Sequence, residues 1–193
     1  SLNGVVYRDS VRTGGDRFDE AIVTHVRRRY GNLIGDDTIL RVAREGAVVV
    51  PTNITYDVLA KRGAEFGLPP ESVAKIDDVR EAGLERLVKM HDAGVTMGYG
   101  SDLLGGMQSE QSGEFPLRGR YIPADAVIRA ATVDAAKVLR MEGEIGALVA
   151  GASADLIAVE GNPLENLDLL TDQGAHIPLI MKEGQVVKRV GTL

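Results

Sequence analysis

The sequence of 193 residues contains no cysteine, which excludes disulfide bonds and metal sites built on thiolates. No apolar run approaches the roughly 20 residues that a membrane-spanning helix requires. Positive charge is also sparse, because the net charge is −6 and the densest basic run is Arg27–Arg29. Such a run is too short to follow a phosphate backbone. These absences predict a soluble, cytoplasmic protein that binds neither nucleic acid nor a membrane.

The composition that remains is that of a globular protein. Apolar residues make up 44% of the chain and charged residues 26%. A chain of this length and composition can bury one substantial core. We therefore expect one domain, or one domain with a small appendage.

The stretch Gly94–Gly105 organises the rest of the chain. Apolar and β-branched residues predict a buried strand, which ends abruptly in Gly-Ser-Asp and further glycine. In α/β proteins, ligands and catalytic groups gather where parallel strands end. Asp102 is therefore the leading candidate for chemistry, although an aspartate in this place can also cap a helix or close a turn.

Strands and helices alternate before this stretch. Ala47–Thr52 predicts a second buried strand, followed by a loop over Asn53–Asp57. Helical segments are predicted over Val58–Phe66 and, after a break rich in proline, over Val73–Ala93. Helices long enough to cross over between two strands favour a parallel sheet or part of a (β/α) barrel.

A polar, glycine-bearing loop is predicted after Asp102, over Leu103–Arg120. Its carboxylates Glu110 and Glu114 are expected to be solvated. Near the C-terminus, Ile177–Val190 predicts a hairpin that turns at Glu183 and Gly184. A small β element is therefore expected after the α/β part.

Three segments follow one another in the C-terminal third of the chain, namely Thr132–Leu139, Gly143–Ile157 and Gly161–Leu164. Together they resemble the C-terminal signature of the amidohydrolase superfamily of metal-dependent hydrolases. The strand that ends in Asp102 resembles the family's eighth barrel strand. The resemblance covers roughly residues 31 to 190, and its motifs are far more specific together than any one alone.

The resemblance implies an α/β fold. The chain would form the C-terminal part of a (β/α)8 barrel, about strands six to eight, followed by strands of a small β-sandwich. The corresponding domains are residues 1–141 for the partial barrel and 142–193 for the β-sandwich segment. Such a piece leaves two sheet edges unpaired, with the inward faces of Val48, Val50, Val95 and Met97 expected to be exposed. Self-association, or pairing with a missing N-terminal half, is expected.

Further motifs are Pro51–Thr52 with Thr55–Asp57, Gly67–Ser72, and Asp102–Gly105 with Gln111–Phe115. They resemble, more narrowly, the prolidase-like dipeptidases and carboxypeptidases of this superfamily. The implied reaction is metal-assisted hydrolysis of a peptide or amide C–N bond in a small substrate. Divalent ions, expected to be zinc, would activate a water molecule. Asp102 would bind metal and accept the proton of that water, and Tyr56 would contact the substrate.

The departures from the family pattern concern its metal ligands. The family's His-x-His pair, bridging lysine and first single histidine have no counterpart here. Tyr30 stands where a further histidine is expected, within Arg29–Ile34. A phenol is a poor substitute for imidazole, and a catalytic zinc takes about three protein ligands. The chain alone is therefore expected to be inactive and not to hold the metal.

Two other interpretations remain open at this point. The chain could be a non-catalytic structural or interaction remnant that pairs with another chain through its sheet edges. It could also be an unrelated α/β binding domain. The second alternative lacks support because the sequence carries no glycine-rich phosphate-binding fingerprint.

Overall fold

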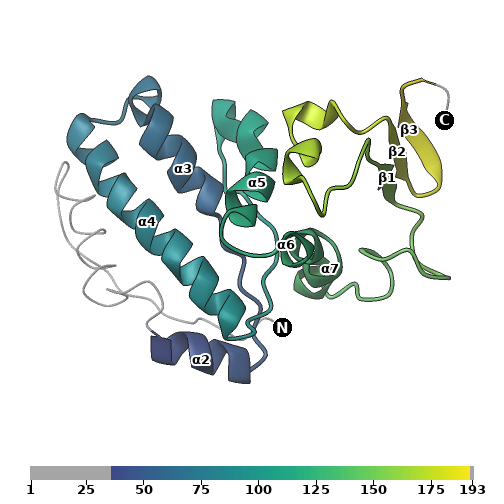
Figure 1. Cartoon of the computed structure of the whole chain (residues 1–193), viewed down its shortest axis with the longest axis horizontal. Coiled ribbons are helices and arrows are strands. Elements are labelled where there is room, and N and C mark those ends of the chain that lie inside the picture. The colour runs from purple at the N-terminus through teal and green to yellow at the C-terminus, as the bar shows by residue number, and fades with distance from the viewer. Residues whose placement is uncertain (1–35, 192–193) are drawn as a thin grey trace, which may run out of the picture. The chain divides into compact units, whose positions relative to one another are not determined.

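The computed structural model describes residues 36–191 (Figure 1). The compact unit Asp36–Leu193 contains every element described below. Its helices and strands are α2 (Asp36–Arg44), α3 (Asn53–Arg62), α4 (Pro70–Asp92), α5 (Glu114–Gly119), α6 (Ala124–Ala131), α7 (Val133–Leu139), β1 (Leu156–Ala158), β2 (Leu179–Lys182) and β3 (Gln185–Arg189). Short 3-10 helices occupy Gly63–Phe66, Gly105–Gly113, Leu167–Leu170 and Asp172–Gly174.

Two extended segments lie side by side in parallel, as the alternation of strands and helices predicts. Val49 and Met97 form the bridge between them. The Val49 N–H donates to the Thr96 carbonyl at 3.0 Å, and the Gly98 N–H donates to the Val49 carbonyl at 2.8 Å. Because α3 and α4 connect the two segments, the connection has the order of a strand–helix–strand crossover, the unit of α/β folds, although the pairing is a single bridge.

The inward side chains of both parallel segments were expected to be exposed. This expectation is wrong for one of the two segments. Val95 and Met97 are buried, at 5% and 6% exposure, whereas Val50 is 40% exposed and Val48 is half-buried. Side chains alternate between the two faces of a strand, so Val95 and Met97 share one face. That face belongs to the core, whereas Val50 of the other segment is exposed to solvent.

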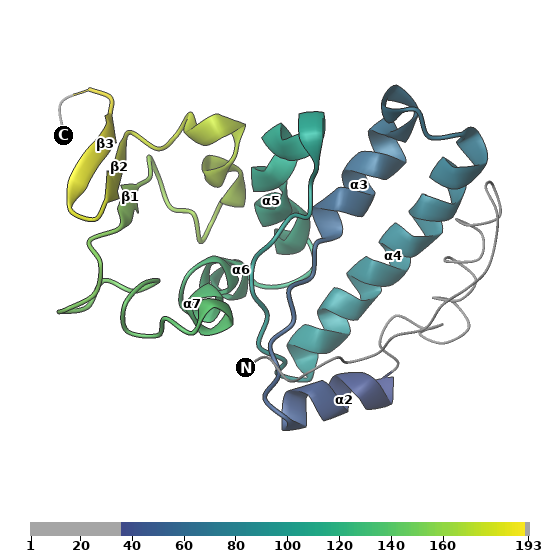
Figure 2. The same ribbon diagram turned by 180° about the vertical axis from the view of Figure 1, so that it is seen from behind.

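Helix α4 is the longest helix of the described residues, and its sequence shows why it forms. Pro70 and Glu71 stand in the first turn, where proline and an acidic side chain are favoured. Its buried residues Leu84, Leu87 and Met90 follow one another at the three-residue spacing of a helix face. Burying each such side chain stabilises the fold by roughly 1.5–3 kcal/mol. Helix α4 packs along α3, as both views show (Figures 1 and 2).

Two predicted loops are helical. The loop expected over Asn53–Asp57 is the first half of α3. The loop expected over Leu103–Arg120 contains the 3-10 helix Gly105–Gly113 and α5. The Thr52 side chain makes no capping hydrogen bond at the start of α3. The group that caps α3 lies far away in the sequence. No residue near Thr52 therefore indicates that a helix begins there.

The predicted C-terminal hairpin is confirmed. Strands β2 and β3 are antiparallel and joined at Glu183 and Gly184, which both have positive φ, of 50° and 79°. Two such residues suit the tight turn of a two-residue hairpin loop. Strand β1 pairs with the other side of β2, giving the order β1-β2-β3. The sandwich that this sheet would join, and a domain boundary after residue 141, remain predictions.

None of the helices in the described part of the chain is long and apolar enough to cross a membrane.

Candidate active site at the ends of the parallel segments

Asp102 lies where the predicted strand ends, at the start of the segment that leads into α5. Its side chain is exposed, and its backbone has a positive φ of 50°. Non-glycine residues adopt this left-handed conformation infrequently, and such residues cluster at functional sites. The carbonyl of the preceding residue, Ser101, accepts a hydrogen bond from the Thr55 hydroxyl. The loop that carries Asp102 is thereby tied to α3.

Tyr56 directly follows Thr55 in the first turn of α3 and is 37% exposed. The hydrogen bond from Thr55 to Ser101 therefore joins the residue before Tyr56 to the residue before Asp102. The two segments that carry the predicted site residues meet at the same end of the parallel pair. This arrangement suits a site in which one residue does chemistry and the other contacts a ligand.

Glu114 is fully buried, and the expectation that it is solvated is wrong. Its exposure is 0%, and it begins helix α5. Its carboxylate accepts hydrogen bonds from the Asn53 N–H at 3.3 Å and from the Ile54 N–H at 2.5 Å. These are unpaired amides of the first turn of α3, where a negative charge is favoured by the helix dipole. Glu114 therefore supplies the cap that Thr52 does not.

Arg118 lies one turn after Glu114 and is also fully buried. Its Nε donates to the Glu114 carboxylate at 2.6 Å. Its Nη1 donates to the Gly98 carbonyl at 3.0 Å, and its Nη2 donates to the Pro51 carbonyl. One guanidinium therefore joins both parallel segments at the ends where their loops leave. The fixed fork of donors in arginine makes such simultaneous bonding possible.

The half-buried Tyr99 packs against this buried pair. Its ring lies 5.5 Å from the Arg118 guanidinium carbon, measured to the ring centroid, and 4.4 Å from the Phe115 ring centroid. Its hydroxyl donates to the Gln111 carbonyl at 2.8 Å. The contacts combine ring stacking with a cation over an aromatic face.

Burial dominates the electrostatics of the buried group. Burial raises the pKa of the Glu114 carboxyl, and the Arg118 guanidinium and the two α3 amides act against this rise. Burial, together with the charge of Glu114, also raises the pKa of the Tyr99 hydroxyl. Charged forms are costly in this part of the core unless they are paired.

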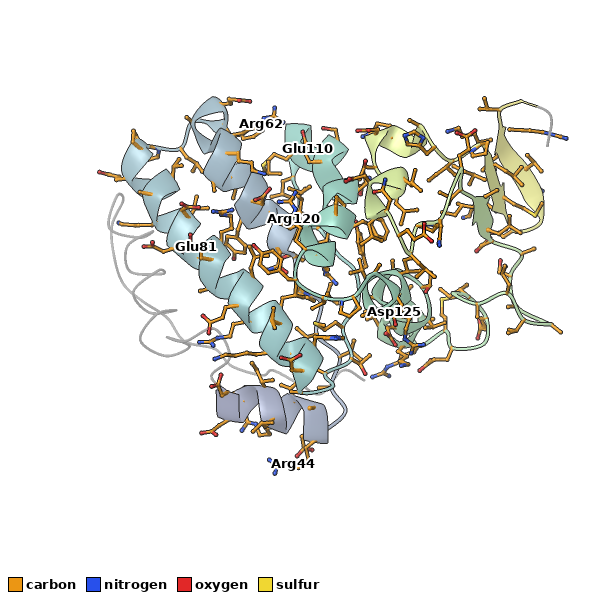
Figure 3. All side chains as sticks on the ribbon, in the orientation of Figure 1. Arg44, Arg62, Glu81, Glu110, Arg120 and Asp125 are labelled. Carbon is orange, nitrogen blue, oxygen red and sulfur yellow. The ribbon has the colours of Figure 1, made fainter. Side chains whose placement is uncertain are left out.

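The sequence carried a weak signal for Glu114 and Arg118. A carboxylate followed four residues later by arginine is the ordinary spacing of an exposed helical ion pair. Only the apolar Phe115 and Leu117 between them suggest that the short helix is buried. Glu110 does lie near the surface as expected, where Arg62 bonds its carboxylate at 2.8 Å (Figure 3).

The described residues do not by themselves fit a catalytic metal. Within 36–191, no cluster of three or more histidine, cysteine, aspartate or glutamate side chains is placed to hold an ion. A catalytic zinc takes about three protein ligands, and Asp102 offers one carboxylate. The histidine position assigned to Tyr30 lies outside the described residues.

Two hollows on the described surface lie away from Asp102. The larger, of about 430 Å³, is lined by residues of α5, the start of α6 and residues 164–168. The smaller, of about 200 Å³, lies between α3 and α5. Neither includes Asp102 or Tyr56 in its lining.

Comparison with known families shows to which family the chain belongs. The model of the amidohydrolase family matches residues 15–187, which is most of the sequence. The chain belongs to the amidohydrolase family. The resemblance noted from its C-terminal motifs is thereby confirmed.

A solved structure and a curated relative are similar to most of this chain. A prolidase crystallised with N-methylphosphonate-L-proline has a TM-score of 0.77 and 46% identity, over 83% of this chain and 39% of that protein. The ochratoxinase of Aspergillus niger is 30% identical over 159 residues, which are 81% of this chain and 32% of the relative. The chain thus spans about a third of the length of these relatives.

A different protein matches part of the chain. The cell shape-determining protein MreB of Escherichia coli strain K12 is 43% identical over 88 residues, which are 45% of this chain and 25% of MreB. The match to MreB therefore covers less than half of this chain.

Proposed function

We propose that the chain is the C-terminal part of a metal-dependent amidohydrolase that cleaves a peptide or amide C–N bond, as a prolidase-like dipeptidase or carboxypeptidase does. The observation that carries the proposal is the place of Asp102, exposed at the end of a parallel segment in a chain of this family. The similarity to a prolidase that binds a proline phosphonate supports the substrate class.

Asp102 has the central role in this proposal. Its carboxylate would contribute one ligand to a divalent metal site, expected to hold zinc, and would act in proton transfer. Tyr56, exposed on the neighbouring turn of α3, would contact the substrate. The remaining metal ligands would come from polypeptide outside the described residues, because those residues hold no ligand cluster. The isolated chain is accordingly proposed to be inactive.

The alternative is a non-catalytic remnant that pairs with another chain through its sheet edges. One feature favours it, namely that the described residues cannot complete a metal site. The two proposals differ in what Asp102 does when the missing part of the barrel is supplied.

Fragment complementation tests the proposal. The purified chain is mixed with the N-terminal portion of the solved prolidase relative, and bound zinc is measured by elemental analysis after dialysis. Cleavage of dipeptides that end in proline is then assayed. We expect less than one equivalent of zinc and no turnover for the chain alone, and both zinc and turnover for the mixture. Asp102→Asn should remove the gain.

Two outcomes would count against the proposal. Stoichiometric zinc on the chain alone would show that the ligands are present after all. A mixture that forms a stable complex but cleaves nothing, with or without Asp102→Asn, would support the non-catalytic alternative.

A further inference from the structure

The buried Glu114–Arg118 pair makes more contacts with loops than a pair that only stabilises a helix requires. Arg118 donates to the carbonyls of Pro51 and Gly98, and Glu114 accepts from the first amides of α3. Every one of these partners lies where a parallel segment ends or where the following helix begins. The ion pair therefore contacts both segments that form the candidate site, but it does not contact the exposed side chains of Asp102 and Tyr56.

A continuous set of bonds leads from this pair to Asp102. Glu114 holds the Ile54 amide, Ile54 is followed by Thr55, and the Thr55 hydroxyl donates to the Ser101 carbonyl. Ser101 is bonded covalently to Asp102. On the other segment, Arg118 fixes the Gly98 carbonyl, four residues before Asp102. The segment that leads into Asp102 is thus held at two points, Gly98 and Ser101, by bonds that start from one ion pair.

We propose that Glu114 and Arg118 are positioning residues that set the place of the Asp102 loop relative to the first turn of α3. This inference rests on the proposed role of Asp102, since it assigns the pair a purpose in the site. A buried, fully paired arginine and carboxylate have few alternative arrangements, because any displacement leaves a charge unpaired away from water. Such a pair therefore suits fixing the spacing of two loops.

A fluorine reporter beside Asp102 measures the position of the loop. The chain has no cysteine, so Leu104→Cys provides a single thiol for a trifluoromethyl label. Leu104 is exposed and lies two residues after Asp102, which makes it a mild site for labelling. The fluorine NMR shift of the label is read in the full chain, and amide hydrogen exchange is measured on the same samples.

Three variants separate positioning from stability. Glu114→Gln keeps the shape of the side chain but replaces one acceptor oxygen by a donor. Thr55→Val removes the bond to Ser101 and leaves the ion pair intact. Glu85→Gln is the matched control, because Glu85 pairs with Lys89 at the same four-residue spacing on an exposed face.

We expect Glu114→Gln to move the fluorine signal and to speed exchange of the Asn53 and Ile54 amides about tenfold, as loss of charge-assisted bonds predicts. Thr55→Val should move the signal without changing exchange at Asn53 and Ile54. Glu85→Gln should change neither.

The inference is overturned if Glu114→Gln speeds exchange evenly across residues 36–191, because the pair would then act only on global stability. It is also overturned if Thr55→Val leaves the signal in place, a result that decides the matter even if Glu114→Gln fails to fold. Neither readout requires metal or turnover. Failure of the complementation assay would therefore be distinguishable from failure of this inference.

Discussion

Val49 and Met97 are bridged in parallel, and the bridge is the one pairing that the structure gives to either of these two residues. Because parallel sheets are normally buried on both faces and extended over several strands, a pair of this kind has edges that call for further strands. Val50, next to the bridge, is 40% exposed. This relationship leads to the first prediction.

We predict that the chain self-associates at micromolar concentration, measured by sedimentation velocity. An unpaired edge with an exposed apolar side chain favours pairing with a second copy. Val50→Lys should shift the distribution towards monomer. The control is Leu148→Lys, which also places a charge at an exposed apolar position but outside the parallel pair. A compact monomer for the unmodified chain would contradict the prediction.

We predict that Arg118→Met strongly destabilises the fold. The change leaves Glu114 buried without its cation and two carbonyls without their donor. Breaking one side of a buried pair costs about 3–5 kcal/mol. The thermal midpoint is compared at equal chain concentration, because association shifts it. Lys89→Met, on an exposed pair with Asp36, should leave the midpoint nearly unchanged. Equal effects of the two changes would argue against a buried role for Arg118.

We predict a loss of stability at alkaline pH that depends on Tyr99. Burial raises the pKa of its hydroxyl above the value of about 10 in an unfolded chain. The folded state therefore keeps the proton longer, so the contribution of Tyr99 to stability is complete below about pH 10 and falls as pH rises further. Urea unfolding of Tyr99→Phe should show a smaller decline above pH 10. An identical decline in both proteins would contradict this.

The similarity to MreB leads to a prediction about the residues before Asp36. The solved prolidase covers 83% of this chain, which is about the share formed by the compact unit Asp36–Leu193. We propose that the sequence similar to MreB includes the first 35 residues, in which case Tyr30 does not stand in for a ligand histidine. A chain that begins at Asp36 should keep its thermal midpoint and its exchange pattern. A clear drop in the midpoint would indicate that the earlier residues belong to the barrel.

Local pattern was enough to predict the elements whose determinants lie within them. The apolar spacing predicts helix α4 from Val73, although the helix already begins at Pro70, within the segment taken as a break, and the hairpin follows from Glu183 and Gly184. The start of α3 could not be found in this way, because its cap is Glu114, some sixty residues later in the chain. The same long-range contact explains why Glu114 was predicted to be solvated.

The candidate site was predictable to a similar extent. The place of Asp102 after an extended segment that pairs in parallel follows from sequence, while its role and that of Tyr56 stay predictions. Arg118 could not be singled out, because its partners are backbone carbonyls that no sequence pattern identifies. The stretch was predicted as a buried strand, but the partial barrel was expected to expose Val95 and Met97, since alternation along a strand does not say which face is covered.

The left-handed backbone of Asp102 affects how any substitution there should be interpreted. Asparagine tolerates a positive φ at least as well as aspartate, whereas alanine does not. An alanine variant would therefore combine loss of the carboxylate with a conformational penalty of about 1 kcal/mol or more at the start of the loop. Glycine would relieve that penalty and loosen the loop at the same time. Only the amide variant changes the charge of the side chain while leaving the backbone preference intact.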